Sequence, residues 1–416
     1  MIRRIIGRTK KTTAEWWLNT GAPGVADRRA FRAAPAPTAD RRVHVLVAPP
    51  GGGNIGDQAL VEAFLENTTG PVRVIVRRAA DLVVPAEQAE RIEVVELPAL
   101  LYRVDAAHRR DIVRLRALLT DAVSFTVVGA DIMDGRYSPR GSVNRSNVAE
   151  LAAIAGVDSR ILGFSWNGAA RPAARRALVR ASRAGVRVLL RDPLSAERAR
   201  RDHVQHVQEV ADIVFAAHTV QPGIVHEVLP AGAGQPFAIV NVSGLVAKKV
   251  GQLDEYARVI EHLRAKDIPI VLLPHVIRPG ADDLDACRAL LGAVGSRGIT
   301  LVERVLRPAE VRGLCAGASF VVTGRMHLAI MAMMNGKPAV TLSTQGKVEG
   351  LMRLLGVPQL SVEPTPGFGS RIVDLIDEVR PDDSPARAAI AEHLPHLVDL
   401  ARRNLDGLPV TTAGRV

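Results

Sequence analysis

Short apolar runs rich in β-branched residues alternate along the chain with Ala-, Arg- and Leu-rich stretches of helical period. Apolar runs of this length, separated by helices, are typical of parallel strands that are covered on both faces. The pattern therefore predicts an α/β fold with parallel sheets. The expected strands are 43–48, 72–76, 92–96, 124–129, 160–164, 186–190 and 213–216, followed by 237–242, 269–273, 299–302, 319–323 and 338–343.

A Pro- and Gly-rich break separates the two series of strands. We expect two doubly wound α/β domains, at 43–221 and 237–365, joined by a linker at 222–236. Residues 1–42 are expected to form a basic arm and linker, and residues 366–416 a C-terminal helical segment and tail. Ligands bind such sheets beyond the carboxyl ends of the strands, so the residues just after each run carry most of the information about function.

Composition agrees with a folded chain of two or three domains, because 47% of the 416 residues are hydrophobic and 23% are charged. The net charge of +11 is uneven, since residues 1–42 hold ten Lys or Arg against three Asp or Glu, a net charge of +7. We expect no nucleic-acid partner for the remaining, nearly balanced body. The only two cysteines, Cys287 and Cys315, have no metal-ligand spacing, so we expect two small core residues and no metal site.

No apolar run reaches the roughly 20 residues that a membrane-spanning helix needs, and the start MIRRIIGRTKK lacks the apolar core of a secretory signal. We therefore expect a soluble, cytoplasmic protein. Trp16 and Trp17 lie beside a basic cluster within a short helical candidate at 12–18. Such a pair suits a peripheral contact of residues 1–20 with the inner membrane face, although an arm docked on its own domain is the alternative.

A glycine-rich loop follows the first strand. Its glycines at positions 51, 53 and 56 satisfy G-x-G-x-x-G between a strand and a helix, the spacing of a dinucleotide site. Against that interpretation, Asp57 falls in the first turn of the helix, where its carboxylate would cap the amides that a pyrophosphate needs. A turn with an Asp N-cap explains Asp57 but leaves Asn54 unexplained.

Two later strands end in polar residues. Asp131 and Asp134 follow the strand at 124–129 and could orient sugar hydroxyls or act as a base, although a plain Asp turn is the alternative. Arg191 closes the strand at 186–190, and the residues after it are ordered as helix caps. At the carboxyl edge of a sheet, the guanidinium of Arg191 suits phosphate or carboxylate.

The densest signal lies at 319–356, where Arg325, Met326 and His327 form the first turn of an almost wholly apolar helix. Cations at a helix N-terminus oppose the helix dipole, so Arg325 and His327 suggest that an anion binds between them. The next strand brings Lys347 to the same edge, whereas Met326 is most simply a packing residue. His275, after the strand at 269–273, is a further candidate, with a structural role as the alternative.

These features together resemble the polysaccharide pyruvyl transferase family. The matching segments, in order, are GGGNIGDQAL at 51–60, the strand and turn near 124–135, LLRDPLSAERAR at 189–200, VADIVF at 210–215, VLLPH at 271–275 and TGRMHLAIMAMMNGKPAVTLSTQGKVEGL at 323–351. The resemblance implies a GT-B-like fold, in which two doubly wound parallel-sheet domains face a cleft. The first domain would take the acceptor and the second the donor.

The resemblance also implies an activity, the transfer of the enolpyruvyl group of phosphoenolpyruvate onto two hydroxyls of a sugar in a cell-surface polysaccharide or glycolipid precursor. Arg191, Arg325 and His327 would meet phosphoenolpyruvate, with His327 as the general acid. Asp131 or Asp57 could take the hydroxyl proton. Met326, Lys347, Asn54 and His275 complete the candidate substrate-binding residues.

The expected donor is a substrate, so no cofactor is expected. The expected acceptor is a saccharide, free or lipid-linked, and a homo-oligomer is a further partner hypothesis. The competing classes are a GT-B glycosyltransferase that uses a nucleotide sugar, an NADP-dependent oxidoreductase that uses the loop at 51–56, and a catalytically silent binding protein.

Overall fold

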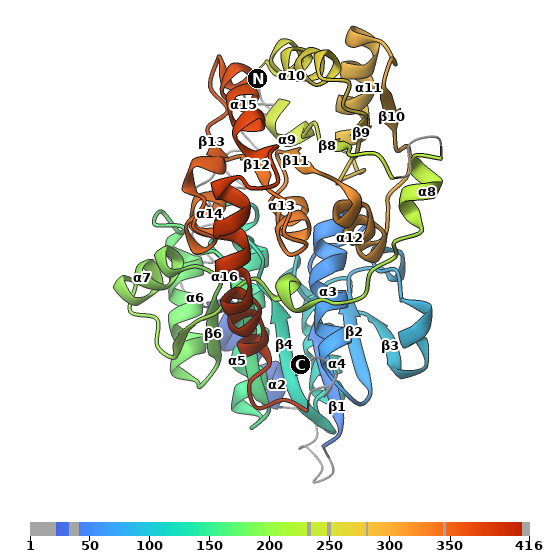
Figure 1. The fold of residues 1–416 in the computed structure, drawn as a ribbon. Helices are drawn as coiled ribbons and strands as arrows, with labels where there is room; N and C mark the ends of the chain where they lie inside the picture. The colour runs from blue at the N-terminus through green and yellow to red at the C-terminus, as the bar shows by residue number, and fades with distance from the viewer. Residues whose placement is uncertain are drawn as a thin grey trace, which may run out of the picture. The chain divides into compact units, whose positions relative to one another are not determined.

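The computed structural model describes residues 22–32, 41–230, 234–247, 251–279, 282–343 and 347–409. Contacts between residues divide the chain into two compact units. Unit 1 takes in the described parts of Met1–Pro50, Asn67–Ile213 and Arg402–Val416, and unit 2 those of Gly51–Glu66 and Val214–Ala401. Each unit contains one parallel sheet (Figure 1).

Unit 1 is built on a seven-stranded parallel sheet of order β3-β2-β1-β4-β5-β6-β7. The strands are β1 (Val43–Val47), β2 (Val72–Val76), β3 (Ile92–Glu96), β4 (Ala122–Val128), β5 (Asp158–Phe164), β6 (Arg187–Leu190) and β7 (Val207–Glu209). The helices are α2 (Ala22–Arg32), α4 (Ala106–Leu118), α5 (Pro139–Ile154), α6 (Pro172–Arg183) and α7 (Pro193–Arg201). The order starts in the middle and grows outward in both directions, which is a doubly wound arrangement.

Unit 2 repeats this plan with a six-stranded parallel sheet of order β10-β9-β8-β11-β12-β13. The strands are β8 (Ala238–Val240), β9 (Ile270–Leu272), β10 (Ile299–Leu301), β11 (Phe320–Thr323), β12 (Ala339–Leu342) and β13 (Ser361–Val362). The helices are α3 (Ile55–Asn67), α8 (Ile224–Val228), α9 (Gly244–Ala247), α10 (Leu253–Ala265), α11 (Asp283–Val294), α12 (Pro308–Gly317), α13 (Met326–Met333), α14 (Lys347–Leu354), α15 (Phe368–Val379) and α16 (Pro385–Arg402). The last residue of α3 and the last of α16 fall in unit 1.

These two doubly wound parallel sheets confirm the expected fold class, and eleven of the thirteen strands in the described residues overlap ranges expected from the apolar runs. The run at 213–216 is wrong, because Ile213–Ala216 is a buried 3₁₀-helix, and a short apolar run does not distinguish a strand from a helical turn. The strand at this edge is Val207–Glu209, whose residues are half-buried or exposed and give no apolar run. Cys287 and Cys315 are fully buried in α11 and α12, as expected for core residues.

The stretch expected to be a linker contains a packed helix, α2. Phe31 is buried in the core of unit 1, and buried Asp27 accepts hydrogen bonds from His108 Nε2 at 2.9 Å and Asn147 Nδ2 at 3.1 Å. These contacts fix α2 to α4 and α5, so the linker expectation is wrong for 22–32. The helical candidate at 12–18, with Trp16 and Trp17, lies outside the described residues.

The segment Gly51–Glu66 belongs to unit 2, although it lies between β1 and β2 in the sequence. Near the end of α3, the carboxylate of Glu66 accepts hydrogen bonds from the backbone amides of His218 and Thr219, at 2.6 and 3.0 Å, and from Arg312 Nη2 at 2.8 Å. Arg312 is fully buried, so this ion pair holds α3 against α12. The domain ranges expected from the sequence stay a prediction, but these contact units assign 51–66 and 402–409 differently.

One turn earlier in α3, burial raises the pKa of Glu62 to about 7. The pKa of Glu62 is higher in the folded protein than in the unfolded chain. The wild type therefore has its full stability below about pH 4.5 and loses the contribution of Glu62 as the pH rises through about 7. Glu62→Gln keeps the shape without the charge, so the variant should be more stable than the wild type by about 3 kcal/mol at pH 8 and equal at pH 4. Denaturant unfolding at both pH values measures this, with the exposed Glu392→Gln as the control. Equal stabilities at pH 8 would show that the pKa of Glu62 is not raised in the folded protein.

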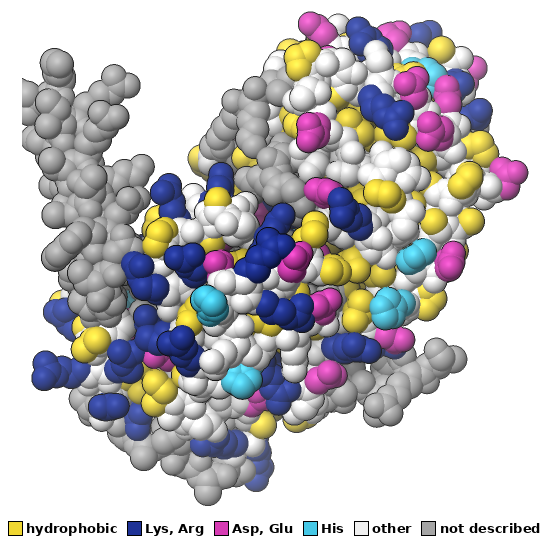
Figure 2. All heavy atoms as spheres, turned by 90° about the vertical axis from the view of Figure 1, so that its left-hand side faces the viewer, with side chains coloured by type: hydrophobic (Ala, Val, Ile, Leu, Met, Phe, Trp, Pro, Cys, Tyr) yellow, Lys and Arg dark blue, Asp and Glu magenta, His cyan; other side chains and the backbone are white. Residues whose placement is uncertain are grey.

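Basic side chains of unit 1 are not confined to the N-terminal region. The helices α6 and α7 carry exposed arginines at positions 175, 176, 183, 200 and 201. Figure 2 shows many Lys and Arg side chains on the face to which these helices belong.

Within the described part of the chain, no helix has both the length and the apolar character needed to cross a membrane.

Candidate active site

The candidate site of unit 2 lies where the winding of its sheet reverses. The neighbouring strands β8 and β11 lead to crossovers in opposite directions, and Asn241 and Arg325 follow their carboxyl ends. His275 follows β9, the strand on the other side of β8. Doubly wound sheets bind their ligands at such a reversal. Three strands thus deliver polar residues to one edge of the sheet.

A buried carboxylate, Asp283, connects these strand ends. It is fully buried at the start of α11 and accepts hydrogen bonds at both oxygens. The backbone donors are the amides of Gly244 (2.9 Å), His275 (3.1 Å) and Val276 (3.1 Å), and the side-chain donor is Asn241 Nδ2 (3.1 Å), directly after β8. Because these donors come from two segments of the chain, Asp283 fixes the loops after β8 and β9 relative to each other.

Arg325 completes this network with a two-point ion pair. Its Nε lies 3.0 Å from Oδ2 of Asp283, and its Nη2 lies 2.5 Å from Oδ1. Its own amide donates to Thr323 Oγ1 at 2.9 Å, and Thr323 Oγ1 donates to Asn241 Oδ1 at 3.1 Å. Arg325 occupies the N-cap position of α13, but its side chain makes no capping bond. The guanidinium is thus held in a fixed plane at the positive end of a helix.

His327 follows in the first turn of α13 and lies against the glycine-rich loop. A Cβ atom at residue 56 would come within 2.3 Å of His327 Nδ1 and 2.8 Å of its Cγ. Only a glycine at position 56 therefore leaves room for the imidazole. The spacing that suggested a dinucleotide site instead admits the side chain of His327.

The glycine-rich loop is bound to the segment after β9. Ile277 N donates to Gly53 O at 2.7 Å, and Ile55 N donates to His275 O at 3.1 Å. Gly53 has a φ of +71°, and a Cβ there would lie 2.1 Å from Ile277 O, so this position also requires glycine. The backbone pairing of the loop brings Asn54 and the start of α3 to the candidate site.

The expected N-cap of this helix is corrected. The side chain of Asn54, immediately before α3, accepts from the amide of Gly56 at 3.1 Å, which is the geometry of a cap. Asp57 lies inside the first turn, 3.8 Å from Arg278 Nη1. With the Gly56 amide bound by Asn54 and the glycine covered by His327, the structure argues against a pyrophosphate at this helix end.

His275 is a buried histidine next to the charged groups. It is 2% exposed, and within the described residues neither ring nitrogen has a hydrogen-bond partner. Burial holds the pKa of His275 well below the usual range, and the charges of His327 and Arg325 lower it further. Its imidazole is therefore neutral at physiological pH, and its unpaired nitrogens can bind a polar ligand or water.

The remaining candidates of unit 2 are more peripheral. Met326 is 7% exposed and packs at the start of α13, which confirms that it contributes to the core. Lys347 is half-buried at the first position of α14, after the carboxyl end of β12. Its proposed part in anion binding stays a prediction.

Arg191 and Asp131 belong to unit 1. Arg191 is 4% exposed, and it donates to Asp212 Oδ2 at 2.7 Å and to Ser165 Oγ at 2.9 Å. Asp131 is half-buried in the loop after β4 and accepts from the Tyr137 hydroxyl at 3.3 Å. The residue before it, Ala130, has a φ of +47°, in the region that favours glycine. The roles assigned to Arg191 and Asp131 stay predictions.

Sequence reasoning missed Asp283. It stands in an Asp-Asp pair before a helix, a pattern that is ordinary for caps, and Asp282 does cap α11 by accepting from Leu284 and Asp285 amides. The available signal was the second aspartate, because one carboxylate is enough for a cap.

Within the described part of the chain, no group of three His, Cys, Asp or Glu side chains is placed to hold a metal ion.

Solved structures with a similar fold include UDP-GlcNAc 2-epimerases and glycosyltransferases. A UDP-GlcNAc 2-epimerase from Methanocaldococcus jannaschii has a TM-score of 0.55 at 10% identity, covering 84% of this chain and 97% of that one. A glycosyltransferase from Rickettsia africae has a TM-score of 0.53 at 10% identity, covering 88% and 99%. Anabaena HepE, in complex with UDP and glucose, has a TM-score of 0.50 at 13% identity, covering 88% and 96%. These similarities confirm a GT-B-like fold.

The comparisons of the sequence are more specific about family. A search of curated proteins found no match. The family model for polysaccharide pyruvyl transferases matches residues 54–346, which is more than half of the chain and includes the segments that hold Asn54, Asp283, Arg325 and His327. The chain therefore belongs to the polysaccharide pyruvyl transferase family.

Proposed function

We propose that this protein transfers the enolpyruvyl group of phosphoenolpyruvate onto two hydroxyls of a saccharide and forms a cyclic ketal. The observation that carries the proposal is the fixed placement of Arg325 and His327 at the N-terminus of α13, within a chain of this family. A guanidinium, an imidazole and a helix N-terminus together suit a small polyanion. Phosphoenolpyruvate has a phosphate and a carboxylate, so it matches that set of groups.

The ion pair with Asp283 sets how Arg325 can act. Asp283 binds Nε and Nη2, so the guanidinium plane is fixed before a ligand arrives. A preorganised cation stabilises developing negative charge without first having to reorient. We assign Arg325 to the leaving phosphate or the carboxylate of the donor. Lys347 and Arg191 are proposed as further cationic contacts.

The reaction needs one proton donor and produces one phosphate. His327 gives a proton to the methylene carbon of phosphoenolpyruvate, and the first sugar hydroxyl adds to the resulting cationic carbon. Loss of inorganic phosphate then lets the second hydroxyl close the ketal, and the two hydroxyl protons restore the imidazole and protonate the phosphate. Imidazole is the side chain that changes its charge nearest neutral pH, so it suits this role. Asp131 or Asp57 is proposed to take one hydroxyl proton and pass it on to the phosphate.

A neutral His275 suits a binding role. Burial keeps its imidazole uncharged, so it can act as a neutral hydrogen-bonding group beside Arg325. Its buried ring nitrogens can bind an oxygen of the donor. We therefore propose that His275 orients phosphoenolpyruvate.

Gly56→Ala should reduce turnover at least about tenfold, because the new Cβ would displace the imidazole of His327 by more than 1 Å and such misplacements cost activity. Steady-state phosphate release measures the loss, and circular dichroism checks the fold. The control is Gly292→Ala in the exposed part of α11, where a Cβ meets no atom within 4 Å. Unchanged turnover in a folded Gly56→Ala variant would contradict the placement of His327.

Donor dependence separates this proposal from its alternative, a nucleotide-sugar glycosyltransferase. The protein is incubated with candidate saccharides and either phosphoenolpyruvate or a nucleotide sugar. We expect phosphate release and a pyruvylated saccharide only with phosphoenolpyruvate. Release of a nucleotide and a glycosylated product would instead support the glycosyltransferase. The acceptor as a polysaccharide or glycolipid precursor and the formation of a homo-oligomer stay proposals.

We also propose that residues 1–20, which lie outside the described residues, contact an anionic membrane surface. Basic residues near such a surface contribute about 1 kcal/mol each. The truncation must end before Ala22, because α2 has the buried residues Asp27 and Phe31. Deleting residues 1–20 should abolish sedimentation with phosphatidylserine vesicles and leave thermal stability unchanged. Equal sedimentation of the truncated and full chains would exclude this contact.

A further inference from the structure

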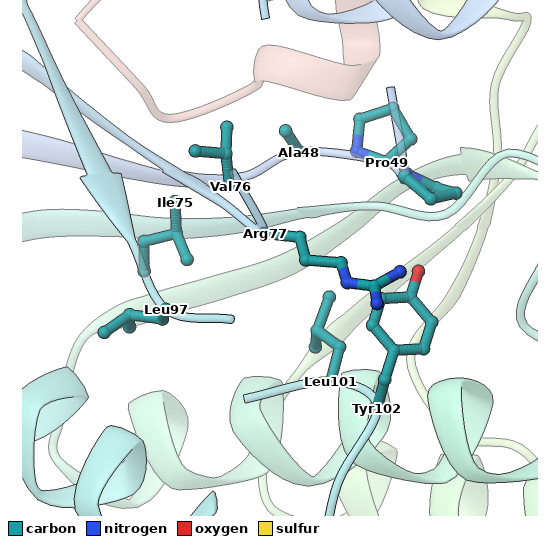
Figure 3. Close-up of a pocket in the computed structure, with 9 residues that line it drawn as sticks. Ala48, Pro49, Ile75, Val76, Arg77, Leu97, Leu101 and Tyr102 are labelled. Atoms are coloured by element: carbon teal, nitrogen blue, oxygen red, sulfur yellow. The ribbon is translucent and has the colours of Figure 1, made fainter. Parts of the chain in front are cut away.

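Unit 1 has a pocket at the carboxyl ends of β1 and β2 (Figure 3). Pro49 and Pro50 follow β1, Val76 ends β2, and these residues with other apolar side chains form most of its walls. Two polar side chains, Arg77 and Tyr102, lie at one end, with the Arg77 guanidinium carbon 5.5 Å from the centroid of the Tyr102 ring. None of the residues lining this pocket belongs to the candidate active site.

Two more arginines, both from the first half of α5, contact Tyr102. Arg145 lies 5.4 Å from the ring centroid, and its Nη2 donates to the tyrosine hydroxyl at 2.8 Å. Arg140 Nη1 donates to the backbone oxygen of Tyr102 at 3.3 Å. Three guanidinium groups therefore surround one tyrosine.

Arg145 is the informative member, because it is 1% exposed and yet has no carboxylate at ion-pair distance among the described residues. Its Nε is buried without an acceptor there, and so is the Nε of Arg140. A buried charge without a counter-ion is strongly unfavourable, and one cation–π contact with one hydrogen bond returns only part of that cost. The start of α5 adds to the positive potential, since its first turn has no acidic residue.

We propose that Arg77, Arg140 and Arg145 around Tyr102 form a binding site for a phosphoryl group. A phosphate ester has more than one negative charge and several acceptor oxygens, and guanidinium groups bind such oxygens in pairs. Exposed Arg77 gives access from solvent, while buried Arg145 supplies the charge that needs a counter-ion.

In the proposed reaction, the ligand of this site is a saccharide acceptor that carries a phosphoryl group. This last step rests on the proposed function, whereas phosphoryl binding at Tyr102 does not. The proposed acceptor and the donor, phosphoenolpyruvate, both carry a phosphoryl group that could bind at Tyr102. The experiment therefore needs one arm in which phosphoenolpyruvate is already bound.

Isothermal titration of the full chain with inorganic pyrophosphate tests the site. Arg77→Gln removes an exposed cation and should weaken binding about tenfold or more. Arg78→Gln is the matched control, because Arg78 is also exposed but pairs with Asp81 at 3.0 Å instead of contacting Tyr102. The same titrations are repeated with saturating phosphoenolpyruvate, and with glucose 1-phosphate against glucose.

We expect pyrophosphate to bind the wild type and Arg78→Gln equally, to keep binding when phosphoenolpyruvate is saturating, and glucose 1-phosphate to bind more tightly than glucose. Unchanged affinity in Arg77→Gln would overturn the site. Full displacement by phosphoenolpyruvate would show that the phosphate subsite belongs to the donor. If glucose binds as tightly as glucose 1-phosphate, phosphoryl recognition is wrong. Failure of pyruvyl transfer would leave the pyrophosphate titration unaffected, so the two proposals fail separately.

Discussion

Asp283→Asn should destabilise the protein by about 3–5 kcal/mol, because it removes one partner of a buried ion pair. Asp283 is fully buried and accepts from Arg325, Asn241 and three backbone amides. The asparagine amide would bring donor hydrogens toward groups that are themselves donors. The side chain of Arg325, 14% exposed, would lose its ion pair with Asp283. Denaturant unfolding monitored by circular dichroism measures the loss of free energy.

Asp282→Asn is the matched control for this prediction. Asp282 is the adjacent residue and caps α11 through hydrogen bonds from two amides, and asparagine caps a helix about as well as aspartate. We expect a change of less than about 0.5 kcal/mol for Asp282→Asn. If Asp283→Asn costs no more than the control, Asp283 does not hold the site together.

His327→Ala should lower turnover by about 10²- to 10⁴-fold and leave the fold intact, because a general acid contributes that much to rate. Its imidazole lies at the start of α13, against the backbone of Gly56. Removing the imidazole therefore leaves the buried apolar side chains of α13 in place. Phosphate release from phosphoenolpyruvate in the presence of an acceptor measures turnover. Thermal stabilisation by phosphoenolpyruvate should persist, since Arg325 is unchanged.

The control for this substitution is His396→Ala, an exposed histidine in α16 of the same unit. It should retain wild-type turnover. A folded His327→Ala variant with wild-type turnover would exclude His327 as the acid. Loss of both turnover and ligand stabilisation would assign His327 to binding instead of proton transfer.

The fold followed from the sequence where strands are buried on both faces. Such strands form apolar runs, and β2 matches its expected range residue for residue. The edge strands β7 and β13 have three and two residues and were missed, because neither forms a long apolar run. The helix α2 was not predicted, because its sequence and its flanks are rich in Pro, Gly and Arg. It packs on α4 and α5, which are distant in the sequence.

The candidate site was predictable only in part. Arg325 and His327 stood out because cations at a helix N-terminus are unfavourable without an anion. The contact of His327 with Gly56 joins residues far apart in sequence, and no local pattern indicates it. For the same reason, Gly51–Glu66 was expected in the domain of its flanking strands, whereas its contacts are with unit 2. Asp283 was overlooked because its donors come from loops that meet only in the folded sheet.

The central claim is that His327 protonates the methylene carbon of phosphoenolpyruvate during transfer to a saccharide. Running the reaction in D₂O and analysing the product by NMR and mass spectrometry tests this claim directly. We predict a saccharide ketal whose methyl group carries one deuterium, formed together with inorganic phosphate by the wild type and lost in His327→Ala. A ketal without deuterium in its methyl group, or equal product from His327→Ala, would contradict the account.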